Sequence, residues 1–398
     1  MPVMAFLTLD DKNECIGYYL DGKLVFDEDP SKQNISHTWK YHPSLKNKDI
    51  QYANLYVDGK DFAEVCPDHL KDEWNRLSTM AKSLIRSFIE AKVSLKENCF
   101  YDLVPKKFLI DYSQIKCEIT EHIINTVEKP HDYQYRLDLE KLLVDIKFNK
   151  LNLDFQQLKN EQHEQKTRDF NNKFSIKDNT IVYNQFHSKT GRLTTEENSF
   201  PVLTMNKDFR KIIQPTNDFF IDIDYNAAEV RTFLALCGEK QPDIDIHEWN
   251  MEKFGFEDRT EAKNNFISWL YGKKNKKEKD FKEIYKTHLI KEKYWNGTEI
   301  TNYYGKKILS DEFHAINYVI QSTTAGLVLR QAIAVHKLLQ NYKSKIVMII
   351  HDNIVLDIKK EEKHIIQSIV DIYNNTEFGK FKASVKIGKN LSEMRKLS

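Results

Sequence analysis

Two apolar, strand-like segments of the sequence end in aspartates, which can bind divalent cations. Asp222 and Asp224 close an apolar segment that starts at Phe220, and Asp352 follows the apolar residues 346–350 and one histidine. A carboxylate at a strand end is held rigidly and can face a cleft, which suits a hard cation such as Mg²⁺. An ionised aspartate between buried strands is costly unless its charge is compensated, and a metal shared by Asp224 and Asp352 would compensate it. Two alternatives stay open: Asp224 as a helix N-cap, and Asp352 as an ordinary turn residue.

A segment between these aspartates carries cations on one predicted helical face. Arg259 and Lys263 lie four residues apart, and Tyr271 lies eight residues further on, close to the same face. With His247 they could clamp a polyphosphate. Residues 259–293 contain eleven Lys and Arg against five Asp and Glu. Such a run indicates either a solvated helix face or a surface that meets phosphates.

The elements that must position these residues follow from hydrophobic periodicity. Residues 1–65 contain β-rich runs, with an Asp-Gly hairpin signal at 21–22. Apolar residues recur at helical spacing from Pro67 to Ile89, and a second helical stretch is predicted from Tyr133 to Phe174. Further strands are predicted at 181–183, 219–224 and 345–351, and further helices at 227–236, 259–270 and 313–339. The unequal gaps between strands indicate an α+β fold.

Composition narrows the class of protein. The chain has 398 residues, 40% of them hydrophobic, which is enough for two or three domains with buried cores. Because 60 Lys and Arg nearly cancel 59 Asp and Glu and 12% of residues are aromatic, a disordered polyelectrolyte is excluded. No apolar run approaches the ~18 residues of a membrane helix, and the first residues do not resemble a secretory signal. Five scattered cysteines without a C-x-x-C pair argue against disulfides and zinc and favour a reducing cytosol.

Taken in order, these motifs resemble those of the family A DNA polymerases, which include bacterial DNA polymerase I and many phage replicases. Asp224-Tyr-x3-Glu229-x-Arg231 resembles motif A of that family. Motif B is matched by Arg259-x3-Lys263-x7-Tyr271-Gly272, and motif C by Ile350-His351-Asp352. Three further segments, Thr190-Gly-Arg192-Leu, Thr301-x3-Gly305-Lys306-Lys307 and Asn317-x3-Gln321-x-Thr323, resemble stretches that flank these motifs. The resemblance covers about residues 181 to 358.

The resemblance implies a template-directed DNA polymerase with a right-hand architecture: an antiparallel palm sheet, helical fingers and a reduced or atypical thumb. It implies two Mg²⁺ ions, for which Mn²⁺ can substitute, held by Asp224 and Asp352 with a backbone carbonyl of Ile223 or Tyr225. Lys263 is expected to take part in catalysis. The residues expected to contact the incoming dNTP are Arg259, Lys263, His247, Tyr271, Glu229 (against C2′ of the sugar) and Ile267. Those expected to contact primer–template DNA are Arg192, Asn317, Gln321, His351, Lys306 and Lys307.

The chain departs from the family pattern at four positions. Ile267 stands where motif B usually carries Phe, although Phe266 precedes it. Asn353 replaces the Glu common after His-Asp. The other two departures are Phe313, in place of a frequent Arg, and Ala227, in place of the motif A Gln.

The resemblance also suggests a division of the chain and a set of partners. The expected parts are a β-rich region (1–66), a helical thumb candidate (67–175), palm (176–244 and 311–398) and fingers (245–310). We expect a monomeric, cytoplasmic enzyme of phage DNA replication that uses primer–template DNA and dNTPs, with unspecified accessory proteins, no membrane and no 3′–5′ proofreading. Two alternatives remain: a single-subunit RNA polymerase, whose relatives carry a small residue at Glu229, and a catalytically inactive nucleic-acid-binding relative.

Overall fold

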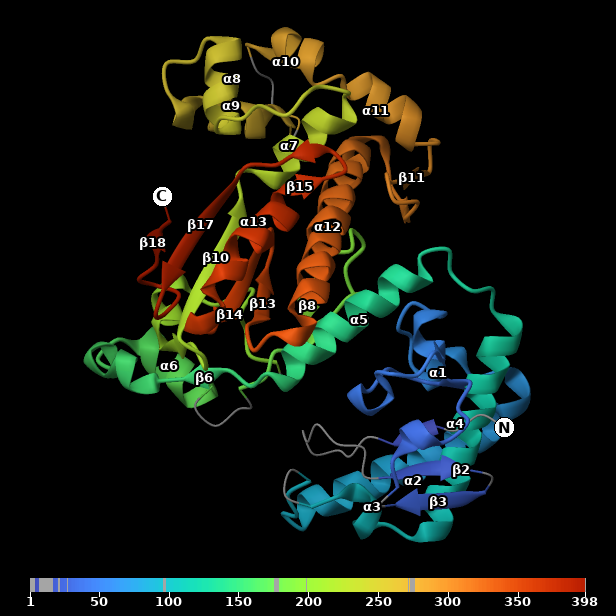
Figure 1. Cartoon of the computed structure of the whole chain (residues 1–398). Coiled ribbons are helices and arrows are strands. Elements are labelled where there is room, and N and C mark those ends of the chain that lie inside the picture. Colours follow the sequence, from blue (N-terminus) through green and yellow to red (C-terminus); the bar gives the residue numbers. More distant parts are fainter. Residues whose placement is uncertain are drawn as a thin grey trace. The chain divides into compact units, whose positions relative to one another are not determined.

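The computed structural model forms two compact units, Met1–Phe148 and Asn149–Ser398 (Figure 1). It describes residues 4–6, 17–20, 22–26, 28–95, 98–174, 179–197, 199–270, 272 and 276–397. Within these ranges no helix is long and apolar enough to cross a membrane. This division into two units was not predicted from the sequence. The finer division into five ranges stays a prediction.

The first unit combines a small sheet with long helices. Strands β1 (Met4–Phe6), β2 (Gly17–Leu20) and β3 (Lys23–Phe26) form an antiparallel sheet, and the hairpin predicted between β2 and β3 is confirmed by the pairing of Leu20 with Lys23. A short parallel pair, β4 (His37–Thr38) and β5 (Gln51–Tyr52), follows. The helices are α1 (Phe62–Val65), α2 (Lys71–Glu90), α3 (Phe100–Leu103), α4 (Lys106–Thr126) and α5 (Tyr133–Phe148).

Helix α2 buries the face that its periodicity predicted. Trp74, Leu77 and Ala81 are buried, and they share one core with Phe108 and Ile115 of α4. Helix α4 itself was not predicted from the sequence. It is stabilised by this tertiary packing, which commonly contributes more to a helix than local propensity does.

The single helix predicted over 133–174 was wrong, because the chain is interrupted there. Helix α5 ends at Phe148, strand β6 (Asn152–Leu153) pairs with β9 (Ile213–Gln214), and α6 spans Gln165–Phe174. Between β6 and α6, the Asp154 side chain accepts a hydrogen bond from the Gln156 amide and so begins a 3₁₀ turn. Asn and Asp favour such local bonds over a continuous helix.

A five-stranded antiparallel sheet is the centre of the second unit. The strand order is β13 (Lys345–Ile350), β14 (Asn353–Ile358), β10 (Phe219–Tyr225), β17 (Ala383–Gly388) and β18 (Arg395–Lys396). Side chains alternate between the faces of a strand. Asp222 and Asp224 therefore share one face of β10, and Ile221, Ile223 and Tyr225 share the other.

Helices surround this sheet and carry most of the remaining chain. They are α7 (Ala228–Leu236), α8 (Ile246–Phe254), α9 (Arg259–Leu270), α10 (Glu278–Ile284), α11 (Thr287–Tyr294), α12 (Glu312–Leu338) and α13 (Ile366–Asn374). The predicted helices 227–236, 259–270 and 313–339 are confirmed as α7, α9 and α12. Figure 1 shows α8 to α11 gathered at one end of the sheet, and α12 running alongside it. The α+β class with an antiparallel sheet is thus confirmed.

Helices α7 to α11 share one aromatic core with the short hairpin β11 (Glu299–Thr301) and β12 (Lys307–Leu309) and the first turns of α12. Phe233, Phe266 and Tyr285 are fully buried in it. The small pairs β7 (Tyr183–Asn184) with β8 (Thr194–Thr195), and β15 (Asn375–Thr376) with β16 (Gly379–Lys380), complete the described strands.

Candidate active site

Strand register brings the two predicted metal-binding aspartates together. Asp224 on β10 is paired with Asn353 on β14, and Asp352 immediately precedes Asn353 in the two-residue turn between β13 and β14. His351, the other residue of that turn, is exposed and has a left-handed backbone with φ of 55°. Asp224 and Asp352 both line one cavity of about 460 Å³. Asp352 therefore lies at the turn of a hairpin of two strands, next to the end of the strand that carries Asp224.

The electrostatics of this acidic pair are unfavourable in the protein alone. Burial raises the pKa of Asp224, and the charge of Asp352 raises it further, although Lys386 on β17 opposes the shift. Burial also raises the pKa of Asp352, and the nearby Glu229 carboxylate adds to that effect, with Arg192 and His351 opposing it. Two desolvated carboxylates that repel each other are a setting in which a bound cation is strongly favoured.

The donor set fits Mg²⁺. Carboxylate oxygens are the hard ligands this ion prefers, and it usually takes only one or two carboxylates, with waters and substrate phosphates filling its other positions. Within the described ranges no group of three or more His, Cys, Asp or Glu side chains is arranged to hold a metal, which is compatible with a two-carboxylate site. The Tyr225 side chain is 4% exposed and donates its hydroxyl to the Tyr373 carbonyl, so only its backbone is left to line the cavity.

Asp222 supports the pair and is itself occupied. Its Oδ1 accepts a hydrogen bond of 2.6 Å from Asn353 Nδ2, and its Oδ2 lies 3.9 Å from Lys386 Nζ. The three residues come from adjacent strands on the face that carries Asp224. Asp222 thus anchors the residue after Asp352.

Helix α9 divides its residues between the cavity and the core. Arg259, Lys263 and Ile267, at four-residue spacing, line the same cavity as the aspartates. Phe266 is fully buried in the aromatic core, so it cannot take the place of the Phe that motif B usually offers at position 267. Ile267 is the residue of this pair that faces the site.

Asp245 organises the basic side of the cavity. It caps α8 by accepting from the His247 and Glu248 amides, and it accepts 2.7 Å from Arg259 and 2.6 Å from Asn226. Burial disfavours the ionised carboxylate, but these hydrogen bonds outweigh that cost and hold the pKa of Asp245 well below its usual value. Arg259 is therefore already oriented toward the cavity.

His247 faces the cavity as a neutral side chain. It is 4% exposed, and burial is the main reason that its pKa falls to about 4. Among the atoms described, its Nδ1 has no hydrogen-bond partner. A neutral imidazole with a free ring nitrogen can bind a phosphate oxygen or take up a proton when an anion arrives.

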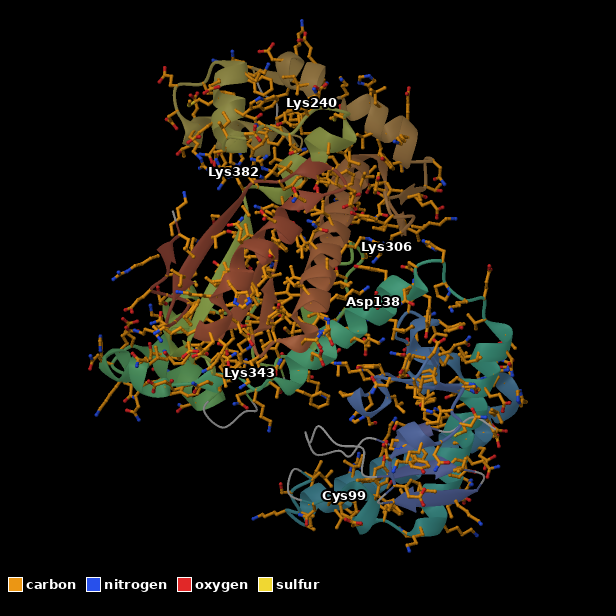
Figure 2. All side chains as sticks on the ribbon, viewed as in Figure 1. Cys99, Asp138, Lys240, Lys306, Lys343 and Lys382 are labelled. Carbon is orange, nitrogen blue, oxygen red and sulfur yellow. The ribbon has the colours of Figure 1, made fainter. Side chains whose placement is uncertain are left out.

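Glu229 projects from α7 into the cavity, and Arg192 forms an ion pair with it. Arg192 also lines a small pocket with His351 and Asp352. It follows Gly191, at which an added Cβ would lie only 3.2 Å from Lys306 Nζ. Lys306, labelled in Figure 2, therefore lies next to the segment that carries Arg192.

The other predicted DNA contacts lie on α12 and on the β11–β12 hairpin. Asn317 and Gln321 are four residues apart and half-buried on one face of α12. Lys307 is exposed and lies 3.8 Å from Glu299. Tyr271, the expected base-stacking residue, lies outside the described residues.

Four lysines of the basic run at 259–293 form ion pairs with acids of the protein. Ion pairs join Lys277 with Asp280, Lys282 with Glu278, Lys286 with Glu239 and Lys291 with Glu312. At these four lysines the solvated-surface interpretation is favoured. Arg259 and Lys263 line the cavity instead, and Arg259 is itself paired with Asp245.

Three residues that shape the site were not predicted from the sequence. Ser384 lines the cavity beside Asp224, Lys386 compensates the acids, and Asn226 holds Asp245. The polar alternation of Ser384 and Lys386 along an otherwise apolar strand was the available signal. It did not indicate which strand β17 would pair with.

Comparison with known proteins agrees with this geometry. The sequence model described as DNA polymerase family A matches residues 269–393, which run from the end of α9 to just before β18. The fold is similar to the POL domain of Pol1 from M. smegmatis, solved in complex with DNA primer-template and dNTP. The TM-score is 0.63 at 10% sequence identity, covering 98% of this chain and 95% of that chain. No curated protein matches the chain.

The fold is therefore that of a polymerase domain. Within residues 269–393 the sequence is similar to DNA polymerase family A, which agrees with the resemblance of the motifs in that part of the chain.

Proposed function

We propose that the chain extends the 3′-OH of a DNA primer with dNTPs by two-metal-ion nucleotidyl transfer. The observation that carries the proposal is the cavity of about 460 Å³ in which the acids Asp224 and Asp352 face the cations Arg259 and Lys263. Transfer from a triphosphate needs both the acidic and the basic side of this cavity. The cations bind its negative charge, while the acidic side holds the reacting phosphorus near the attacking oxygen.

The residues of the chain divide the work of the reaction. Asp224 and Asp352 would hold the metal ions. When bound there, Mg²⁺ supplies charge neutralisation on the triphosphate and a lower pKa for the primer 3′-OH. Arg259 would bind the phosphates through the orientation that Asp245 gives it, with Lys263 adding charge. Ile267 would pack against the nucleotide.

Glu229 would test the incoming sugar at C2′, held in place by Arg192. Excluding a 2′-hydroxyl sterically, and leaving it without a hydrogen-bond partner, both favour dNTPs. Primer–template DNA would be contacted by Arg192, Lys306, Asn317, Gln321, His351 and Lys307. A role in phage DNA replication, a monomeric state and the absence of proofreading in this chain rest on the sequence resemblance.

The test is extension of a labelled primer annealed to a template, with dNTPs and separately with NTPs. Template-dependent extension with dNTPs in the presence of Mg²⁺ is expected, and Asp224→Asn should abolish it while leaving DNA binding intact. If the primer is extended with NTPs and not with dNTPs, the RNA polymerase alternative is favoured. If DNA binds but the primer is extended with neither, the catalytically inactive alternative is favoured. The same primer with a 3′ mismatch and no dNTPs tests proofreading, since metal-dependent shortening would contradict its absence.

A further inference from the structure

A buried pair of tyrosines lies beneath the acidic site. Tyr373, in the last turn of α13, is fully buried, and its ring stacks on Tyr225 with 4.4 Å between centroids and 9° between planes. Tyr225 directly follows Asp224 and lies on the opposite face of β10 from the carboxylates. The stack therefore supports the sheet from its apolar side, under the place where the acids project.

Two hydroxyls connect this stack to the backbone of the site. The Tyr225 hydroxyl donates to the Tyr373 carbonyl, and the Tyr373 hydroxyl donates to the Asp352 carbonyl at 3.1 Å. Buried hydroxyls are costly unless they are hydrogen-bonded, and both are satisfied here by the main chain. One stack thus reaches both the strand that carries Asp224 and the turn that carries Asp352.

Tyr373 is itself held from a third element. Gln331 of α12 donates through Nε2 to the carbonyls of Ile372 at 2.7 Å and Asn375 at 2.8 Å. These bonds satisfy carbonyls at the end of α13 that have no intrahelical partner. The position of Tyr373 relative to the long helix is therefore fixed independently of the turn.

The turn that receives this bond is constrained. Only His351 and Asp352 connect β13 to β14, and His351 adopts a left-handed conformation that non-glycine residues rarely take. Such a conformation persists where the surroundings hold it in place. From one side Asn353 is tied to Asp222, and from the other Tyr373 holds the Asp352 carbonyl.

We propose that Tyr373 is a positioning residue of the polymerase: through its hydroxyl and its stack on Tyr225 it sets how Asp352 faces Asp224. The inference rests on the proposed function, because it takes these two aspartates as the metal site. Groups that orient metal ligands without touching the metal commonly change metal affinity by 10- to 100-fold when removed. Tyr373 carries out this task through the main chain of Asp352.

The decisive variant is Tyr373→Phe, which removes only the hydroxyl and keeps the ring in the stack. Mn²⁺ binding, measured by electron paramagnetic resonance without DNA or nucleotide, should weaken by about tenfold. The Mg²⁺ concentration for half-maximal primer extension should rise in parallel, while KM for dNTP at saturating metal changes less than about twofold. A folded Tyr373→Phe protein that binds Mn²⁺ within about twofold of the wild type would overturn the proposal.

Tyr285→Phe is the matched control. Tyr285 is also fully buried, and its hydroxyl donates to Asn250 at 2.8 Å within the core of α7 to α11. Its loss should lower the melting temperature and leave Mn²⁺ affinity unchanged. If both variants lose stability but neither loses Mn²⁺ affinity, Tyr373 is structural only and the proposal fails.

Tyr225→Phe and Asp224→Asn complete the design. Tyr225→Phe removes the bond to the Tyr373 carbonyl and should weaken Mn²⁺ binding in the same direction, which keeps the test available if Tyr373→Phe does not fold. Asp224→Asn should abolish the binding. Unchanged Mn²⁺ affinity in Asp224→Asn would refute the metal site of the proposed function, and the role of Tyr373 with it. Loss in Asp224→Asn with wild-type affinity in both tyrosine variants would refute the role of Tyr373 alone.

Discussion

Asp352→Asn should make the protein more stable without metal while abolishing primer extension. Burial raises the pKa of Asp352 and the Glu229 charge raises it further, so the ionised side chain is less favourable in the folded protein than in the unfolded chain. An asparagine of the same shape removes that charge, keeps one side-chain oxygen and replaces the other with an N–H donor. Relief of unfavourable active-site features is typically worth about 1 kcal/mol. For a unit the size of residues 149–398, that corresponds to a melting temperature about 2–4 °C higher.

Magnesium should act on the two proteins differently. A wild-type site with a Kd on the order of 1 mM would gain about 1.4 kcal/mol of unfolding free energy from 10 mM Mg²⁺, since binding to the folded state stabilises by RT ln(1 + [L]/Kd). The melting temperature would rise by about 4 °C. In Asp352→Asn the rise should be nearly absent. The difference in melting temperature between Asp352→Asn and the wild type should therefore become smaller, or change sign, when Mg²⁺ is added.

The assay is thermal unfolding of both proteins in EDTA and in 10 mM Mg²⁺, beside primer extension. NaCl at equal ionic strength separates binding of the divalent cation from screening. Wild-type extension by Asp352→Asn would refute the assignment of Asp352. An equal Mg²⁺-dependent rise in both proteins would show that the metal binds elsewhere.

Two further predictions concern the sugar and the phosphate sides of the site. Glu229→Ala should lower the ratio of kcat/KM for dNTP to that for rNTP at least about tenfold, and Arg192→Ala a few-fold, because their ion pair is only partly shielded from solvent. Lys307→Ala should leave the ratio unchanged. An unchanged ratio in Glu229→Ala would refute the proposal that Glu229 excludes the 2′-hydroxyl. Because the pKa of His247 is about 4 in the fold against 6.5 ordinarily, the stability that its neutral form contributes is complete above pH 6.5 and is lost as pH falls through 4. Between pH 7 and pH 4 the wild type should therefore lose about 3 kcal/mol more unfolding free energy than His247→Gln in urea titrations, and equal losses would contradict a buried neutral histidine.

The elements predicted well are those whose pattern is local. Helix α9 has the predicted bounds because Arg259 and Lys263 on one face, and Ala262 and Phe266 on the other, repeat at helical spacing. Strand β10 was equally clear, since a short apolar run ended in acids. The α4 helix was missed because its polar residues obscure one apolar face until α2 packs against it.

The acidic site was predictable in part. Motif order indicated Asp224 and Asp352, and the register of β10 with β14 agrees with that pairing. The third neighbour of the site, β17, lies about 160 residues from β10 along the chain, and no local pattern states which strands will pair. Lys386 and Ser384 could therefore be recognised as polar residues in a strand, but their position beside Asp222 and Asp224 is a product of the tertiary fold.

Register connects the stability of this sheet to its chemistry. The side-chain period of a strand is two, so a slip of one residue between β10 and β14 would turn Asp222 and Asp224 toward the apolar face and Ile223 toward the cavity. The Tyr225–Tyr373 stack opposes such a slip, because it exists only when Tyr225 faces α13. The same apolar contacts that stabilise the sheet therefore exclude the arrangement in which its acids would be separated. Substitutions on the apolar face of β10 should then alter metal affinity even though they touch no ligand.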